Sequence, residues 1–209
     1  MTIPTQTPAK NLFDFPNSAL AEAVATEWQS GKKYSPVNMP LTALAYTAID
    51  KIAGKKNDIV EVLMVYVDTD TLTYRATGSE SLAKLQEEKW GAVLKWAGAR
   101  FDVAWQTTSG VMPVEQSQTL HKALERYLQS LNEWQLAAFC VFSSGFSSIV
   151  LAIAVCEGYL NASDAFILSR LEEEAQAEQW GRDEEAESRA QNIKKEIIDA
   201  EKFLHLLKS

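Results

Sequence analysis

Apolar residues recur along most of the chain at the three- and four-residue spacing that is typical of amphipathic helices. The clearest example is the C-terminal segment, in which one apolar seam follows a single helix face. Its acidic first turn and its later lysines also suit the direction of a helix dipole. The pattern predicts a helix packed against the rest of the domain or against another chain. The seam comprises Ala186, Ala190, Ile193, Ile197, Ala200, Leu204 and Leu207.

The same spacing predicts further helices, several of which begin at a capping residue or end at a glycine. They cover residues 18–29, 40–53, 59–74, 79–99, 116–130, 132–157 and 161–180. Gly91 is expected to break the fourth of them. The segment 101–114 alternates apolar and polar residues and contains Gly110 and Pro113, which predicts two short strands or one hairpin. The predicted fold class is therefore α+β, mainly α.

One uncharged segment has two interpretations, a membrane span or a buried helix. Residues 136–156 are long enough to cross a bilayer, although they include four serines and a glycine. Acidic Glu133 and Glu157 flank the segment, and no lysine or arginine lies between Arg126 and Arg170, so the basic anchors of a membrane span are missing. We therefore expect a helix buried on all sides and no insertion into a membrane.

Composition and charge narrow the function classes. The 209 residues are 46% hydrophobic and 23% charged, as in an ordinary folded protein, and carry a formal net charge of -8. That charge repels nucleic acid phosphates, so we expect no nucleic acid partner and favour a basic protein surface or simple solubility. Cys140 and Cys156 lack a CxxC spacing and are expected to be core residues in a reducing compartment. The N-terminal sequence has no basic region followed by an apolar stretch, so it does not resemble a secretory signal.

Catalytic chemistry has few candidate residues. His121 and His205 lie in polar sequence on separate predicted helices, which is more typical of exposed residues than of a general base. No HExxH, cysteine cluster, GxxxxGK[ST] or GxGxxG pattern is present, so we expect no metal and no cofactor. Asp68 and Asp70 follow an apolar run, as in aspartate-dependent phosphatases, but Leu72 stands where that motif has threonine or valine. We interpret this stretch as a helix whose polar turn faces solvent.

The segment RLEEEAQAEQWGRDEEAE, residues 170–187, combines eight acidic residues with the pair Trp180-Gly181. It predicts either a solvated helix face or a surface for recognition, since aromatic residues are enriched in binding hot spots. Trp180 lies off the apolar stripe that is expected to face the core, so a recognition role and a wedge between the last two helices both remain open. The stripe comprises Leu160, Ile167, Leu168, Leu171 and Ala175.

A series of short blocks in a fixed order resembles one family along nearly the whole chain, from Thr7 to the end. The family is that of the assembly chaperones that bind the α subunit of the catalytic head of F-type ATP synthase. The last block is similar to the family's C-terminal signature of an acidic pair, a glutamine and Trp-Gly. The blocks are TPAKN at 7–11, ALAEAVATEW at 19–28, MPLTALAYTAID at 39–50, DTLTYRA at 70–76, Gln86 with Trp90, and LEEEAQAEQWG at 171–181.

The resemblance implies a small β-containing N-terminal part followed by a larger helical domain. Few residues precede the first block, so we expect residues 1–16 to be the remnant of a β domain and residues 17–209 to form the helical domain, with the hairpin near 101–114. The implied function is to hold the free α subunit until the β subunit replaces it, without enzymatic activity and as a monomer. The alternative is a small-molecule enzyme that uses acidic residues for acid–base chemistry.

The resemblance also implies a site and a location. The location is the cytoplasm in a bacterium or the mitochondrial matrix for a mature eukaryotic chain. The residues expected to contact the α subunit are Glu172, Glu173, Gln176, Trp180, Gly181, Asp183 and Glu184.

Overall fold

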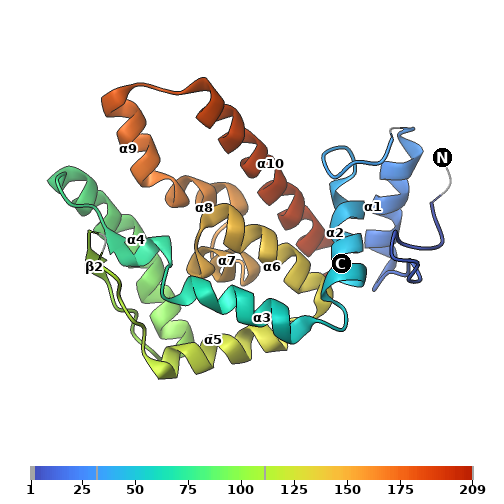
Figure 1. The fold of residues 1–209 in the computed structure, drawn as a ribbon, viewed down its shortest axis with the longest axis horizontal. Helices are drawn as coiled ribbons and strands as arrows, with labels where there is room; N and C mark the ends of the chain where they lie inside the picture. The colour runs from blue at the N-terminus through green and yellow to red at the C-terminus, as the bar shows by residue number, and fades with distance from the viewer. Residues whose placement is uncertain (1–2, 32, 111, 209) are drawn as a thin grey trace.

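The computed structural model describes residues 3–31, 33–110 and 112–208. Most of them lie in helices, which confirms the predicted fold class (Figure 1). The α-helices are α1 (Ser18–Gln29), α2 (Pro40–Tyr46), α3 (Lys56–Met64), α4 (Glu80–Phe101), α5 (Gln118–Ser130), α6 (Glu133–Phe146), α7 (Ile149–Cys156), α8 (Ala162–Ser169), α9 (Leu171–Trp180) and α10 (Glu184–Leu206). The short elements are the π-helix η1 (Thr47–Ile52), the 3-10 turns η2 (Val65–Val67) and η3 (Thr71–Thr73), and the strands β1 (Tyr74–Arg75) and β2 (Thr108–Ser109).

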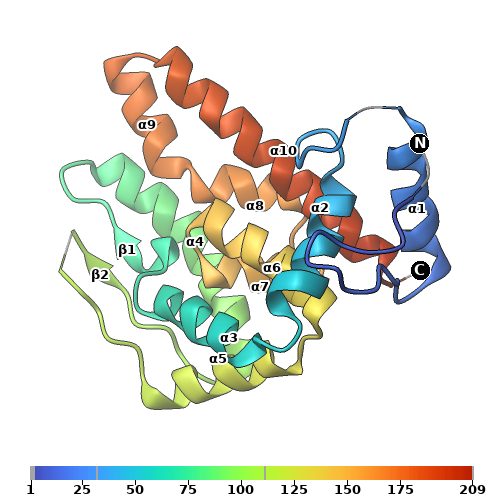
Figure 2. The ribbon, with the colours of Figure 1, turned by 45° about the vertical axis from the view of Figure 1, so that its right-hand side comes forward.

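Helices α6 and α7 form the centre of the molecule, and α10 crosses α6 on its way from α9 to α1 and α2 (Figures 1 and 2). The predicted seam of α10 is confirmed in its main positions, because Ala190, Ile197, Ala200 and Leu204 are buried. The helix packs on α6, α2, α8 and α1 of its own chain. Its last turn is joined to α1 by Asn17, whose Nδ2 donates to the Leu206 carbonyl at 2.8 Å.

The uncharged segment was predicted to be a single helix, but the structure divides it into two helices, α6 and α7. Ser147 adopts a left-handed conformation (φ 50°), and the Ser148 side chain then caps α7 by accepting from the Leu151 amide at 3.0 Å. Each of Ile149–Val155 is buried, as expected for a central helix. None of the helices formed by the described residues is long and apolar enough to cross a membrane.

The helix predicted for residues 59–74 is wrong beyond its first half. Helix α3 ends at Met64, and Asp70 is fully buried instead of facing solvent. Its carboxylate accepts hydrogen bonds of 2.9 Å from the Ser148 hydroxyl and from the Leu72 and Val150 amides, and burial raises its pKa to about 6. Asp70 therefore caps both η3 and the start of α7, which are distant in sequence.

The hairpin predicted for residues 101–114 is also wrong. Helix α4 continues without a break at Gly91 and ends at Phe101, after which Asp102 adopts φ 54°. Thr108 and Ser109 then pair in parallel with Tyr74 and Arg75, so the partner strand comes from an earlier part of the chain.

The N-terminal segment turns at residues 7–10, where the Lys10 amide donates to the Thr7 carbonyl at 2.9 Å, and one side chain of η1 holds this turn. Asp50 accepts hydrogen bonds from the Thr7 hydroxyl at 2.5 Å, the Asn11 side-chain amide at 2.9 Å and the Ala9 backbone amide at 3.2 Å. Within residues 3–16 a single bridge joins Gln6 to Leu12. The division into a β remnant, residues 1–16, and a helical domain stays a prediction.

Candidate partner-binding site on α9

The acidic signature forms α9, the link at residues 181–183 and the first turns of α10 (Figures 1 and 2). Gly181 ends α9 with φ 94°, a conformation that residues with a side chain rarely adopt. Asp183 then caps α10, since its carboxylate accepts from the Glu185 amide at 3.0 Å. Together α9 and the first turns of α10 make a helical hairpin at the end of the molecule opposite α1 and α2, whereas the later turns of α10 pack on those two helices (Figures 1 and 2).

Helix α9 is held on the outside of the protein. Among the described α-helices it is the only one without a buried residue. Trp180 is 80% exposed, more than any other large hydrophobic side chain that the structure describes. The hypothesis that Trp180 is wedged between the last two helices is therefore wrong. The expected core stripe also fails at Ile167, which is 56% exposed, whereas Leu168 and Leu171 do pack against the core.

Arginines neutralise only part of the acidic surface. Arg182 in the link bridges both helices, with Nη2 at 3.0 Å from Glu174 and Nη1 at 2.8 Å from Glu187. Arg189 pairs with Glu185 within α10, and Arg170 lies 3.8 Å from Glu173. Several polar side chains of the hairpin have no hydrogen bond or ion pair with any described residue. They are Glu172, Gln176, Glu178, Gln179 and Glu184.

A groove of about 570 Å³ separates α9 from the start of α4. Glu172 and Gln176 line it, whereas the other five predicted site residues lie outside it. Sequence reasoning missed the opposite wall, to which Ser79, Leu82 and Leu85 contribute, although the exposed Leu85 on a predicted helix was a signal for it. None of the described residues that line the groove is basic, so its charge is negative.

The other blocks that carry the resemblance hold the fold together. Glu27 caps α2 by accepting from the Leu41 and Thr42 amides at 2.9 and 2.8 Å. Gln86 accepts from the Ala76 amide at 2.7 Å, and Trp90 is fully buried with its indole N–H donating to the Leu168 carbonyl at 2.8 Å. Asp50 and Asp70 play similar parts, as described above. The last block differs, because Leu171 packs against the core but Glu172, Gln176 and Gln179 make no hydrogen bond or ion pair with a described residue.

Comparison with known proteins identifies the family. The sequence model described as ATP12 chaperone protein matches residues 3–98. The crystal structure of Atp12 from Paracoccus denitrificans superposes with a TM-score of 0.93 and 38% identity, over 98% of this chain and 88% of that one. The chain belongs to the ATP12 chaperone family. The resemblance seen in the sequence is thus confirmed.

Two further relatives agree with this assignment. The Atu1473 protein of Agrobacterium tumefaciens, a proposed chaperone, has a TM-score of 0.88 and 34% identity, over 98% of this chain and 76% of that one. The mitochondrial protein atp12 of Schizosaccharomyces pombe is 32% identical over 178 residues, which is 80% of this chain. The chain spans 61% of the length of that yeast relative.

Two side chains that the sequence offered as candidates for catalysis, Asp70 and His121, are buried or already hydrogen-bonded within the protein. Asp70 is enclosed in the core with its oxygens occupied by hydrogen bonds, so it cannot reach a substrate. His121 is half-buried, with Nε2 3.1 Å from Asp68. Burial raises the pKa of the Cys140 thiol to about 11 and that of Cys156 to about 12, which keeps both protonated at neutral pH. Within the described residues no group of three or more metal-ligating side chains comes together.

Proposed function

We propose that the chain is a chaperone that binds the free α subunit of F-type ATP synthase and hands it to the β subunit during assembly of the catalytic head. Membership of the ATP12 chaperone family supports this proposal. The exposure of α9 is the observation that indicates where on the chain the α subunit would bind. The family's C-terminal signature lies on a helix without buried residues, where Trp180 and unpaired carboxylates face solvent.

The chemistry of α9 suits a contact that must later be exchanged. An unassembled subunit exposes apolar interface and is at risk of aggregation. One exposed aromatic side chain can anchor such a surface, while Glu172, Glu173 and Glu184 favour a basic rim on the partner. An interface built on one aromatic anchor and a charged rim is moderately polar, which would let the true partner subunit displace the chaperone by competition. This mechanism requires neither nucleotide nor catalysis by the chain.

We further propose that the chain acts as a monomer, in the cytoplasm of a bacterium or in the mitochondrial matrix of a eukaryote. The yeast relative is described as mitochondrial. The buried seam of α10 supports the monomer, because α6, α2 and α8 of the same chain already cover it.

The test is binding and aggregation suppression with purified α subunit in the absence of nucleotide. The wild-type chain should suppress aggregation near one-to-one stoichiometry. Glu173→Lys should weaken binding because it replaces an attractive charge by a repulsive one, while its melting temperature stays near that of the wild type. Glu125→Lys, at an exposed position of α5, is the matched control and should bind normally. Failure of the wild type to bind α subunit would remove the proposal, and normal binding by Glu173→Lys would remove α9 from the site.

A further inference from the structure

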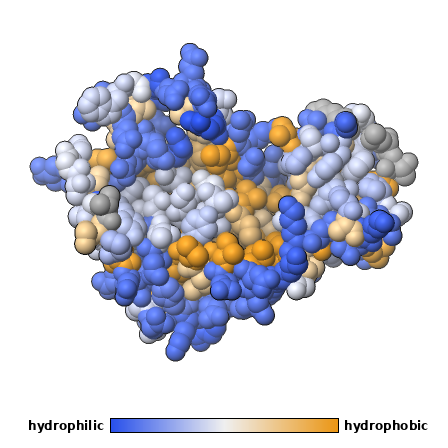
Figure 3. All heavy atoms as spheres, in the orientation of Figure 1, coloured by the Kyte–Doolittle hydropathy of each residue, from blue (hydrophilic) through white to orange (hydrophobic). Residues whose placement is uncertain are grey.

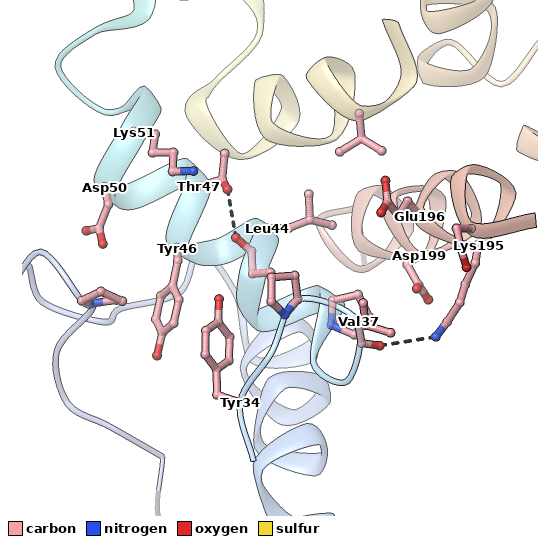
Figure 4. A pocket seen from close by; sticks show the side chains of 16 residues that line it. Tyr34, Val37, Leu44, Tyr46, Thr47, Asp50, Lys51, Lys195, Glu196 and Asp199 are labelled. Atoms are coloured by element: carbon pink, nitrogen blue, oxygen red, sulfur yellow. Dashed lines mark hydrogen bonds between the residues drawn. The ribbon is translucent and has the colours of Figure 1, made fainter. Parts of the chain in front are cut away.

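A second cavity, which the proposed function does not use, lies between α2, η1, the loop before α2 and the middle of α10 (Figure 4). Its volume is about 590 Å³. It shares no lining residue with the groove beside α9. A cavity of this size is in the range of ligand-binding sites, so the chemistry of its walls indicates which kind of ligand it could bind.

Most of the wall is apolar. Val37 is 68% exposed, whereas Leu44 is buried and Val141 is partly buried. Three prolines also line it, namely Pro8, Pro36 and Pro40. Figure 3 shows hydrophobic residues gathered in the hollow beside α2, over α3 and α6. An occupant that covered Val37 would therefore have to extend from the cavity onto the surface, as a segment of polypeptide does.

Two tyrosines form one end of the cavity. The rings of Tyr34 and Tyr46 meet at 63° with their centroids 5.4 Å apart, and Tyr34 also stacks on Trp28 at 6.3 Å. Neither hydroxyl makes a hydrogen bond with a described residue. Nearby Asp50 is already occupied by the N-terminal segment. This end thus offers fixed aromatic faces and hydroxyl groups that a ligand can use.

The opposite end, on α10, has an excess of negative charge. Asp199 is half-buried and has no hydrogen bond or ion pair with a described residue. Burial is the main cause that raises its pKa, and the charge of Glu27 adds to it, whereas the charges of Lys195 and Lys202 act in the opposite direction. Lys195 does not pair with it, because its ammonium donates to the Val37 carbonyl at 3.3 Å (Figure 4). Glu196 adds a second carboxylate to the same wall. A carboxylate in this position favours a cationic ligand.

We propose that this cavity binds a segment of the client protein that inserts a bulky apolar side chain between Val37 and Leu44 and places an arginine or lysine beside Asp199. The apolar wall selects the first group, and the carboxylates select the second. The inference rests on the proposed function, since it assumes that the chain holds an unassembled subunit.

Photo-crosslinking tests where the client lies. A benzoylphenylalanine residue replaces Val37, or Tyr159 as an exposed control outside both the cavity and the groove. Each variant is mixed with purified α subunit and irradiated, and the products are identified by mass spectrometry. Position 37 should react with one segment in which an apolar residue neighbours an arginine or lysine, and position 159 should not react with that segment. Absence of crosslinks at position 37, or equal reaction at both positions, would overturn the inference.

Charge variants test the role of Asp199. Asp199→Lys should weaken binding of α subunit about tenfold or more in calorimetric titration, and Asp199→Asn should weaken it less. Asp199→Asn removes a carboxylate that makes no hydrogen bond or ion pair and whose charged form is disfavoured by burial, so its melting temperature should not fall, which separates a binding defect from a folding defect. Glu125→Lys is again the control for charge. Normal binding by both Asp199 variants would overturn the inference and leave the proposed function intact, whereas a wild-type chain that does not bind α subunit would overturn both.

Discussion

Two of the tryptophans in the recognised blocks, Trp90 and Trp180, provide the sharpest prediction, because they lie at opposite extremes of burial. Trp180 is 80% exposed and Trp90 is fully buried. Replacing each by alanine should therefore separate binding from folding. Trp180→Ala should weaken α-subunit binding with little loss of stability, and Trp90→Ala should destabilise the chain.

The magnitudes follow from the areas involved. Full burial of a tryptophan removes up to about 250 Å² from water, so the buried fifth of Trp180 amounts to about 50 Å². At about 25 cal/mol per Å² this contributes about 1 kcal/mol, and the better helix propensity of alanine offsets about half of it. Trp90→Ala should cost about 3–5 kcal/mol as a large buried truncation. It also leaves the Leu168 carbonyl without the indole donor that lies 2.8 Å away.

Urea unfolding and calorimetric binding to α subunit, measured on both variants, provide the assay. Trp180→Ala should unfold within about 1 kcal/mol of the wild type and lose at least tenfold in affinity, as a hot-spot aromatic does. A stability loss above about 2 kcal/mol in Trp180→Ala would refute the reasoning from exposure. Unchanged affinity in a normally folded Trp180→Ala would refute the anchor role.

Two carboxylates should give pH effects of opposite sign. Burial acts to raise the pKa of Asp50, but the hydrogen bonds from Thr7, Asn11 and Ala9 outweigh burial and lower the pKa. The Asp50 carboxyl therefore loses its proton more readily in the folded state than in the unfolded state. The stabilisation from these hydrogen bonds is present above about pH 4 and is lost as the pH falls through the lowered pKa. Asp50→Ala should cost about 1–3 kcal/mol at pH 7 and speed amide exchange in the N-terminal segment, with a difference from the wild type that shrinks in acid. Burial raises the pKa of Asp70 from 3.8 to about 6, so the folded state holds the proton more tightly than the unfolded state. The stability of the wild type relative to Asp70→Asn should therefore fall by about 2 kcal/mol between pH 4 and 7 in denaturant titrations. A flat difference across that range would contradict the assignment.

The elements that the sequence predicted well are those whose signal is local and repeated. The seam of α10 recurs over six turns, and its burial follows from that spacing alone. The features that were missed depend on partners far along the chain. Asp70 is buried because Ser148, 78 residues away, donates to it, and β2 forms because β1 precedes α4. The break between α6 and α7 was hidden because a serine, rather than a glycine, adopts the left-handed conformation there.

The candidate site was predictable in position but not in its surroundings. Helical spacing placed Trp180 off the core stripe, which is consistent with its exposure. The same spacing placed Ile167 in the core, although it is 56% exposed. Whether an aromatic residue at the end of a helix is covered depends on the direction of the next helix. The turn at Gly181 directs α10 away from Trp180, so the indole stays exposed. The cavity beside α2 had no local signal, because its lining comes from several separate segments.

If α9 and the cavity beside α2 hold the same client, their contributions should combine in a defined way. The two sites share no residue, and Figures 1 and 2 place α9 and α2 at separate ends of the molecule. Free-energy changes at distant, independent sites add within about 0.5 kcal/mol, so the fold losses in affinity should multiply to within about a factor of two. The variant that combines Trp180→Ala with Asp199→Lys should therefore lose the product of the two single losses in calorimetric titration. If the double variant binds no more weakly than the more impaired of the two single variants, the client does not occupy both sites at once. A loss of affinity well beyond the product would show that the sites are coupled through the fold.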